Sequence, residues 1–226
     1  MSNNAKGPTI AIDGPAGSGK STISKLLARH FSFKLVDTGA IYRSLALAAR
    51  QKGLTAVESP ELSALASKIE VDFAWDGEIN RVFLNGLDVS EAIRTEEISA
   101  ASSQFAALPV VRAALLNRQR DLAAKGSVVL EGRDIGTVVY PQAEFKFFLE
   151  ASPEVRAERR IKELAAKGLP TDNVLADIIA RDKRDRERPI APLKAADDAI
   201  VIDTSNMDIA TVLHQMIGHI TINMGA

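Results

Sequence analysis

The stretch GPAGSGKS, residues 14–21, decides the fold, because it fits the spacing G-x-x-x-x-G-K-[ST] at every fixed position. The apolar run PTIAID (8–13) before it predicts a short buried strand, and STISKLLARHF (21–31) after it predicts a helix. Glycines in such a turn let backbone N–H groups point at phosphate oxygens, and the helix N-terminus adds its positive dipole end. The sequence therefore predicts a phosphate-binding loop for a nucleoside triphosphate. Its predicted members are Gly14, Pro15, Ala16, Gly17, Ser18, Gly19, Lys20, Ser21 and Thr22.

Further runs of strand length, rich in β-branched or aromatic residues, follow along the chain, and each precedes a helical segment. They are FKLVD (33–37), SVVLE (127–131), EFKFFLE (144–150) and AIVID (199–203). Apolar strands that alternate with helices indicate a parallel sheet covered on both faces. The expected fold class is therefore α/β, with a five-stranded parallel sheet flanked by helices.

One region, residues 69–90, breaks this alternation. Its sequence, IEVDFAWDGEINRVFLNGLDVS, reads as three short strands joined by the turn dipeptides DG and NG. Because no helix separates these strands, we expect a small antiparallel sheet. Helical segments 95–107 and 109–124 follow before the parallel pattern resumes at Ser127. We therefore expect one domain over residues 1–226 that contains an insertion.

Composition limits the class of partner. The 226 residues carry a formal net charge of −1, which gives no global field to attract nucleic acid or an anionic membrane. The start, MSNNAKGP, does not resemble a signal peptide, and the apolar runs are shorter than a membrane span. The chain has no cysteine, which excludes disulfides and agrees with an intracellular setting. We expect a cytoplasmic monomer with no nucleic-acid or membrane partner.

The charged run RDKRDRERP, residues 181–189, indicates a local anion site. On a helix Arg181, Arg184, Asp185 and Arg188 fall on one stripe, so three guanidinium groups and one carboxylate would share a face. Arginine is suited to holding phosphoryl oxygens in a bidentate manner. The alternative is a solvated helix face without a ligand.

Three further motifs behind the phosphate loop resemble the bacterial cytidylate kinase family. They are DTGAIYR (37–43), EGRDIGTVV (131–139) and RDKRDRERPIAPL (181–193), and the resemblance runs essentially from end to end. It implies a P-loop kinase that transfers the γ-phosphoryl group of ATP to CMP or dCMP with the help of Mg²⁺. It also implies that the antiparallel insert, about 66–107, belongs to the region that binds the nucleoside monophosphate.

The resemblance assigns roles to individual residues. Thr38, Arg43, Arg133 and Arg188 would meet the acceptor phosphate, and Arg181 and Asp185 would approach the sugar. Ser103, Arg112 and Asp134 would read the base. Residues 156–171 would form a mobile lid whose arginines close over the donor phosphates. The expected catalytic set is Lys20, Arg133, Arg159 and Arg188.

We also expect particular pairings and exposures for the charged side chains. Asp185 would steady Arg181 and Arg188, and Asp134 would pair with Arg133. The lid arginines Arg156, Arg159 and Arg160 would have no anion to hold until substrates bind. The remaining members of the charged run would be solvated, namely Asp182, Lys183, Arg186 and Glu187.

Several single residues invite a prediction of their own. Glu131 ends a strand beside the P-loop strand, where an acid commonly helps to hold Mg²⁺, and the Ser21 hydroxyl would be a second ligand. Many family members carry Asp at the position of Glu131. Asp13 is expected to have a structural role, and Trp75 is expected to pack within the insert. Tyr42 would either stack on a pyrimidine or belong to the core.

Two rival functions deserve comparison. Another small P-loop kinase, of adenylate or shikimate type, would share the phosphate loop. The insert and the motif DTGAIYR argue against an adenylate kinase, and the charged run 181–189 and the motif EGRD argue against a shikimate kinase. A P-loop module that binds nucleotide or RNA without catalysis would need a basic stripe and aromatic base platforms. The net charge of −1 and an aromatic content of 5% do not favour it.

Overall fold

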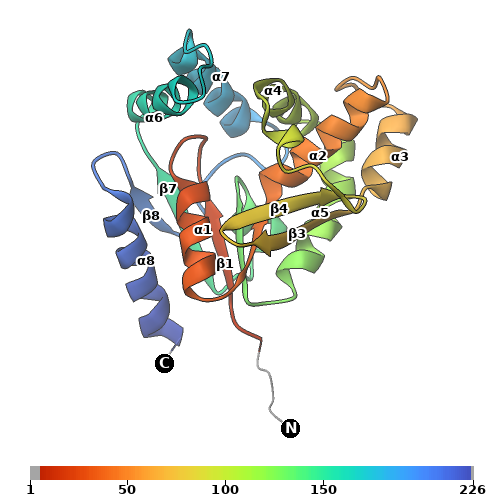
Figure 1. Cartoon of the computed structure of the whole chain (residues 1–226). Helices are drawn as coiled ribbons and strands as arrows, with labels where there is room; N and C mark the ends of the chain where they lie inside the picture. Colours follow the sequence, from red (N-terminus) through yellow and green to blue (C-terminus); the bar gives the residue numbers. More distant parts are fainter. Residues whose placement is uncertain (1–5, 225–226) are drawn as a thin grey trace.

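The computed structural model describes residues 6–224, and its centre is a five-stranded sheet (Figure 1). The strands are β1 (Thr9–Asp13), β2 (Lys34–Asp37), β6 (Val128–Gly132), β7 (Phe145–Glu150) and β8 (Ile200–Asp203). Their spatial order is β2-β6-β1-β7-β8, and every neighbouring pair is parallel. The predicted α/β class and the five predicted strands are confirmed, with bounds that differ by about one residue.

Helices cover both faces of this sheet because alternate strand residues point to opposite sides. Ile10 and Ile12 of β1 pack in one apolar cluster with helices α1 (Lys20–His30) and α8 (Ile209–Met224). Ala11 between them packs in the other cluster, with residues of α2 (Thr38–Gln51), α3 (Pro60–Lys68), α4 (Glu96–Phe105) and α5 (Pro109–Ala123). The sheet is therefore buried on both sides.

Two helices stand above the carboxyl end of the sheet, α6 (Pro153–Ala165) and α7 (Val174–Glu187). Figure 1 shows them at the same end of the molecule as α4, with the two termini at the other end. Ser152 caps α6 by accepting a hydrogen bond from Val155 N, and Pro153 occupies the first turn. Because ligands of parallel sheets bind outside the carboxyl ends of the strands, this end is where a nucleotide site is expected.

The insertion forms the separate antiparallel sheet that its turn dipeptides predict. Its strands are β3 (Val71–Asp76), β4 (Ile79–Leu84) and β5 (Leu87–Asp88), in the order β3-β4-β5. Residues 85 and 86 of the NG turn, Asn85 and Gly86, both have positive φ, as such two-residue hairpin turns require. A short 3₁₀ turn, Ala92–Arg94, then leads into α4.

The insert protects an edge of the main sheet, and this corrects the prediction for Trp75. Trp75 Nε1 donates to the carbonyl oxygen of Phe33 at 3.4 Å, and Asn80 Nδ2 donates to that of Leu35 at 3.2 Å. The Trp75 ring packs against the cluster that contains α1 and α8, and not within a core of the insert. Two side chains of the insert thus satisfy one carbonyl of the edge strand β2 and one just before it, and an uncovered edge would otherwise invite pairing with another strand.

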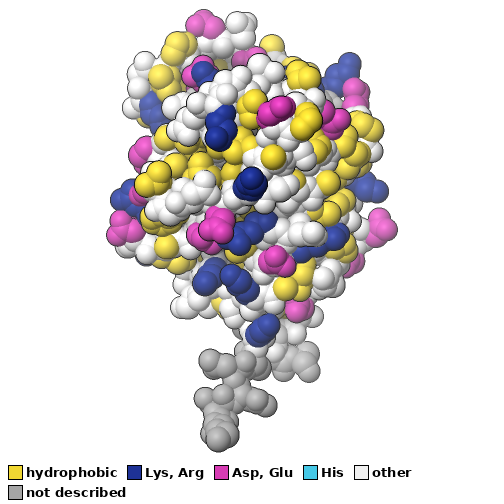
Figure 2. Space-filling model, turned by 90° about the vertical axis from the view of Figure 1, so that its right-hand side faces the viewer, with side chains coloured by type: hydrophobic (Ala, Val, Ile, Leu, Met, Phe, Trp, Pro, Cys, Tyr) yellow, Lys and Arg dark blue, Asp and Glu magenta, His cyan; other side chains and the backbone are white. Residues whose placement is uncertain are grey.

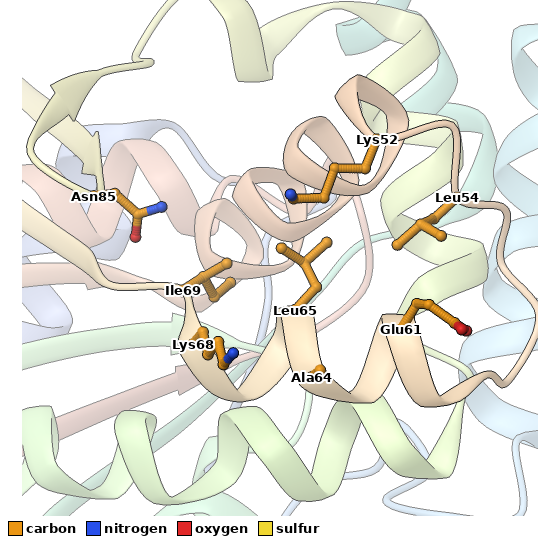
Figure 3. Close-up of a pocket in the computed structure, with 8 residues that line it drawn as sticks. All are labelled: Lys52, Leu54, Glu61, Ala64, Leu65, Lys68, Ile69 and Asn85. Carbon is orange, nitrogen blue, oxygen red and sulfur yellow. The ribbon is translucent and has the colours of Figure 1, made fainter.

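A pocket of about 660 Å³ lies away from the phosphate loop. It is lined by residues that follow α2, by α3 and by Asn85, and Figure 3 shows Leu65 of α3 pointing toward the turn that carries Lys52. Figure 2 views the side on which α3 lies, where apolar side chains are interspersed with charged ones of both signs. In residues 6–224 no single helix is long and apolar enough to cross a membrane. The helices α4 and α5, bent by 100°, pass that test of length and composition only as a pair.

Candidate active site

The phosphate loop connects β1 to α1 with the close backbone packing that its glycines allow. Gly14 has φ +146°, and a Cβ there would lie 1.9 Å from the carbonyl oxygen of Leu149 on β7. A side chain at this position would therefore force the loop off the sheet. Lys20 Nζ donates to the Pro15 carbonyl oxygen at 2.5 Å and to Ser18 Oγ at 3.3 Å. Burial lowers the pKa of the Lys20 ammonium, and the charge of Arg133 lowers it further.

Ser21 and Glu131 meet beside this loop. Ser21 Oγ donates to Glu131 Oε1 at 2.8 Å, and Glu131 is the penultimate residue of β6, which neighbours β1. The second carboxyl oxygen, Oε2, is buried and has no hydrogen-bond partner among the described residues. Burial, followed by the negative charge of Asp37, raises the pKa of Glu131 to about 7. A hydroxyl and a carboxylate with a free buried oxygen fit a hard divalent cation, which prefers oxygen ligands.

Asp13, the last residue of β1, holds the backbone that follows β6. Its two carboxyl oxygens accept from Ile135 N and Gly136 N, each at 2.8 Å. Burial raises its pKa to about 6 despite these two donors, which lower it. The segment Ile135–Val139 is a short π-helix directly after Arg133 and Asp134. Asp13 therefore fixes the direction in which those two side chains leave the sheet, which agrees with the predicted structural role.

Arg112 of α5 and Asp134, which follows β6, form a buried ion pair. Both side chains are 7% exposed, and Arg188 Nη2 donates to the other Asp134 oxygen at 3.2 Å. A guanidinium and a carboxylate side by side present hydrogen-bond donors and an acceptor on one edge. This is the pattern that complements an amino group next to a ring nitrogen acceptor.

Arg133 pairs with Asp185 on α7, through Nε at 3.1 Å from Oδ2. The expected pairing of Asp134 with Arg133 is wrong, because Asp134 binds Arg112 and Arg188. Asp185 hydrogen-bonds to Arg133. Burial lowers the pKa values of Arg181 and Arg188, and the negative charge of Asp185 raises them, so it steadies both as predicted. Arg133 and Asp134 both lie in the turn between β6 and the π-helix Ile135–Val139, where the two side chains contact different elements. Arg133 and Asp134 thus reach two different partners.

Two guanidinium groups in this region keep unpaired donors. The Nε atoms of Arg43 and Arg181 are buried and have no hydrogen-bond partner within the described residues. Arg43 Nη2 donates to Asp37 at 2.6 Å. Burial, followed by the charge of Arg133, lowers the pKa of Arg181 to about 10. Buried donors beside several positive charges call for an anionic ligand, because an unmet buried donor is unfavourable.

Comparison with known protein families and proteins shows which family this chain resembles. The profile described as Cytidylate kinase matches residues 10–222. A cytidylate kinase of Vibrio vulnificus (strain CMCP6) is 47% identical over 215 residues, which cover 94% of this chain and 95% of that protein. One of Syntrophotalea carbinolica is 50% identical over 210 residues, with coverage of 92% and 89%.

The chain belongs to the cytidylate kinase family. The crystal structure of an uncharacterized protein from Eubacterium ventriosum has a TM-score of 0.52 and 18% identity, and the match covers 96% of this chain and 99% of that one. At this identity it shows a shared fold alone. The predicted resemblance is thus confirmed, and the adenylate, shikimate and non-catalytic alternatives lose their support.

The expected substrate residues of this cytidylate kinase family member lie at the same end of the sheet, with differing exposure. Thr38 is buried at the start of α2, and its hydroxyl donates to the Glu131 carbonyl oxygen at 2.8 Å. Ser103 is half-buried on α4. Tyr42 is buried in the core cluster, with Arg112 Cζ 5.7 Å from its ring centroid. Tyr42 therefore belongs to the core, and its ring contacts the Arg112 guanidinium in a cation–π arrangement.

Only part of the charged run, residues 181–189, faces the site. Arg181 and Asp185 face the site, whereas Arg184 is exposed, so the stripe has two inward guanidinium groups and not three. Arg188 lies just past the end of α7, with extended backbone. Lys183, Arg186 and Glu187 are exposed as predicted. The prediction that Asp182 is solvated is wrong, because it pairs with Arg156 of α6 at 2.5 Å.

The lid arginines are also better paired than predicted. Arg159 donates to the carbonyl oxygen of Thr204 at 2.6 Å and to that of Gly17 at 3.4 Å. Arg160 pairs with Glu163 on its own helix and with Glu96 at the start of α4. These arginines therefore hold carboxylates and backbone carbonyls of the protein itself, and do not simply repel one another.

Sequence reasoning missed four residues that organise the site: Asp37, Glu96, Asp182 and Thr204. Asp37 carried a signal, because an acid that ends a strand before TGA can cap the next helix, as it does through Ala40 N at 3.0 Å. Thr204 Oγ1 donates to the Ser18 carbonyl oxygen of the phosphate loop at 3.1 Å. Nothing in the local sequence marks the long-range partners of Glu96 or Asp182.

Proposed function

We propose that this chain transfers the γ-phosphoryl group of ATP to CMP or dCMP and releases ADP with CDP or dCDP. Membership of the cytidylate kinase family supports the reaction. The observation that carries the acceptor assignment is the pair of unmatched buried Nε donors on Arg43 and Arg181, next to Arg133. The acceptor phosphate and sugar would supply the oxygens that these groups lack.

On the donor side, the backbone of residues 14–22 would cradle the phosphates and Lys20 would lie against the terminal ones. The Ser21 hydroxyl and the Glu131 carboxylate would hold Mg²⁺, which neutralises charge on the phosphates when it is bound. The free Oε2 of Glu131 is the feature of this chain that fits this role. Glu131 reaches the site from the neighbouring strand with a longer side chain than Asp.

On the acceptor side, Thr38, Arg43, Arg133 and Arg188 would fix the phosphate. The acceptor oxygen is itself an anion near neutral pH, so no side chain has to remove a proton from it. Catalysis would then consist of positioning and of stabilising the moving charge, which Lys20, Arg133, Arg159 and Arg188 would do. Residues 156–171 would close as a lid once both nucleotides are bound.

Arg112 and Asp134 would distinguish cytosine from uracil. Cytosine offers an amino donor at position 4 and an acceptor at N3, and uracil reverses both. The carboxylate would accept from the amino group, and the guanidinium would donate to N3 and O2. Ser103 on α4 would complete the base contacts, and Arg181 with Asp185 would contact the sugar. A uracil base would place its O4 carbonyl against the Asp134 carboxylate and its N3–H against the Arg112 guanidinium, and these two mismatches are the main source of rejection.

A coupled assay of ADP release tests this function against its rivals. Purified protein is given ATP and Mg²⁺ with CMP, dCMP, UMP, AMP or shikimate in turn. We expect turnover with CMP and dCMP and far less with the other three. Preferred turnover of AMP or shikimate would assign the site to another kinase, and ATP binding with no turnover of any acceptor would indicate a non-catalytic module. Activity that persists in excess chelator would remove the metal from the mechanism.

The remaining assignments are predictions from composition. With a net charge of −1 and no cysteine, we propose a cytoplasmic enzyme whose partners are small nucleotides rather than nucleic acid or membrane. We also propose that it acts as a monomer.

A further inference from the structure

Arg156 is unusual among the arginines of the described chain, because its side chain is only 2% exposed. It lies in the first turn of α6, where the lid leaves the sheet. Its guanidinium donates to the Ala151 carbonyl oxygen through Nε at 2.8 Å and to the Ala16 carbonyl oxygen through Nη1 at 3.1 Å. Three separate parts of the site thus converge on one side chain, because the third partner is Asp182 on α7.

The contact between Arg156 and Asp182 is bidentate. Nη1 lies 3.0 Å from Oδ1, and Nη2 lies 2.5 Å from Oδ2. A planar guanidinium held by both carboxylate oxygens has one orientation, so the pair fixes an angle as well as a distance. Burial makes this rigidity strong, since removing either partner leaves the other charged and buried.

The phosphate loop rests directly on this pair. A Cβ at Gly17, whose φ is +77°, would lie 3.1 Å from Arg156 Cβ. The tip of the loop therefore packs on the stem of Arg156 while the Ala16 carbonyl accepts from its guanidinium. Movement of Arg156 would move the loop that holds the donor phosphates.

Asp182, the other member of the pair, lies on α7 beside the residues expected to face the acceptor, Arg181, Asp185 and Arg188, which we call the acceptor wall. Asp182 follows Arg181 directly and precedes Asp185 by one helical turn, and Asp185 holds Arg133 at 3.1 Å. On α7, Asp182 reaches toward the phosphate loop, whereas Asp185 reaches toward the acceptor side. One rigid helix thus connects the two halves of the site.

We propose that Asp182 and Arg156 are a positioning pair that sets the spacing between the donor phosphate loop and the acceptor wall. The pair touches no reacting atom and acts through Ala16, Gly17 and the neighbouring turn of α7. This inference rests on the proposed function, because the two halves must hold the two nucleotides. It assigns to Asp182, which the charge pattern predicted to be solvated, a positioning role in phosphoryl transfer.

The test is the substitution Asp182→Asn, with Asp177→Asn as its matched control on an exposed position of the same helix. ATP binding is measured by calorimetry without acceptor, kinetics are measured with ATP and CMP varied separately, and Tm is recorded. We expect ATP to bind about 5- to 20-fold more weakly and kcat to fall about 10- to 100-fold, since small misplacement of reacting groups is expensive in rate. The control should match the unmodified protein within about twofold.

A lower Tm with unchanged ATP affinity and unchanged kcat, measured well below the transition, would show a merely structural pair and overturn the inference. If Asp182→Asn does not fold, Arg156→Lys keeps the charge but loses the bidentate contact, and the double change Arg156→Met with Asp182→Leu replaces the buried charges by apolar groups. Such replacements often preserve stability. A stable double variant with full activity would also overturn the proposal, whereas a stable one with weak ATP binding would support it. If the unmodified protein bound ATP but did not phosphorylate CMP, the proposed function would fail while the ATP-binding comparison still tested the pair.

Discussion

The pair of Arg112 with Asp134 and the contact between α6 and α4 are both arginine–carboxylate pairs, but their surroundings differ. In the first region, which is buried, Arg112 and Asp134 are each 7% exposed. At the contact between α6 and α4, Arg160 is 32% exposed and its partner Glu96 is 55% exposed. Buried charges that lose a partner are strongly unfavourable, whereas exposed pairs contribute about 0.2–1 kcal/mol. The first region can therefore define a binding geometry, and the second can only bias a movement.

The phosphate loop lies outside this comparison and should show the largest effect. Lys20→Ala removes the ammonium that would meet the transferring phosphoryl group, and we expect kcat to fall by at least about 10³-fold. Within residues 6–224 the buried Lys20 ammonium donates only to Pro15 and Ser18 of the loop itself, so secondary structure should persist. Steady-state turnover together with circular dichroism checks this. Near-normal turnover would show that the loop binds nucleotide in another way.

The buried region should control the choice of base. Two mismatches of roughly 1–3 kcal/mol each predict a preference for CMP over UMP of roughly 10²–10⁴ in kcat/KM. Asp134→Asn should reduce that ratio to roughly tenfold or less, mainly through lost CMP turnover, because an amide can turn and donate to a carbonyl. The structure adds a second effect, since Asp134 also holds Arg188. UMP is therefore the internal control: an equal loss for UMP and CMP would mean that Asp134 positions Arg188 and does not read the base.

Asp185 offers a milder test of the same buried region. If its carboxylate accepts from the 2′-hydroxyl, Asp185→Ala removes a charge-assisted hydrogen bond that is worth roughly 1.5–3 kcal/mol to CMP and nothing to dCMP. The kcat/KM for CMP should then fall roughly 10- to 100-fold further than that for dCMP. Both substrates should also lose activity in common, because Asp185 holds Arg133. An identical fractional loss for both would assign Asp185 to positioning Arg133 alone.

The same contrast explains which features the sequence could predict. The phosphate loop follows from the spacing of its motif, and the strands follow from short apolar runs that alternate with helices, so both could be predicted from the local sequence. The pairings of Asp134, Asp182 and Trp75 were predicted wrongly because each partner lies far away in the chain, on another element. Asp182 and Arg156 are separated by 26 residues, and only the packing of α6 against α7 brings them together. Charge patterns along one helix give the positions of the charges but not the partners that neutralise them.

The exposed contact between α6 and α4 should give the smallest effect, and the chain supplies a matched control for it. Glu96 and Glu97 are neighbours in the first turn of α4, so both interact alike with the positive end of that helix. Glu96 pairs with Arg160 of the lid, whereas Glu97 pairs with Arg50 of α2, which is also exposed. Of the two pairs, only the first links α4 to α6, the helix that begins the proposed lid.

We therefore expect Glu96→Gln to raise the KM for ATP and CMP by roughly 1.5- to 5-fold at low salt, the range of an exposed ion pair. Glu97→Gln should leave both constants unchanged, although it removes the same charge from the same helical turn. The difference between the two variants should disappear at about 1 M salt, where the Debye length is about 3 Å. Steady-state kinetics at two ionic strengths measures it. If both variants behave alike at low salt, the effect comes from the charge at the start of α4, and the contact with Arg160 does not hold the lid.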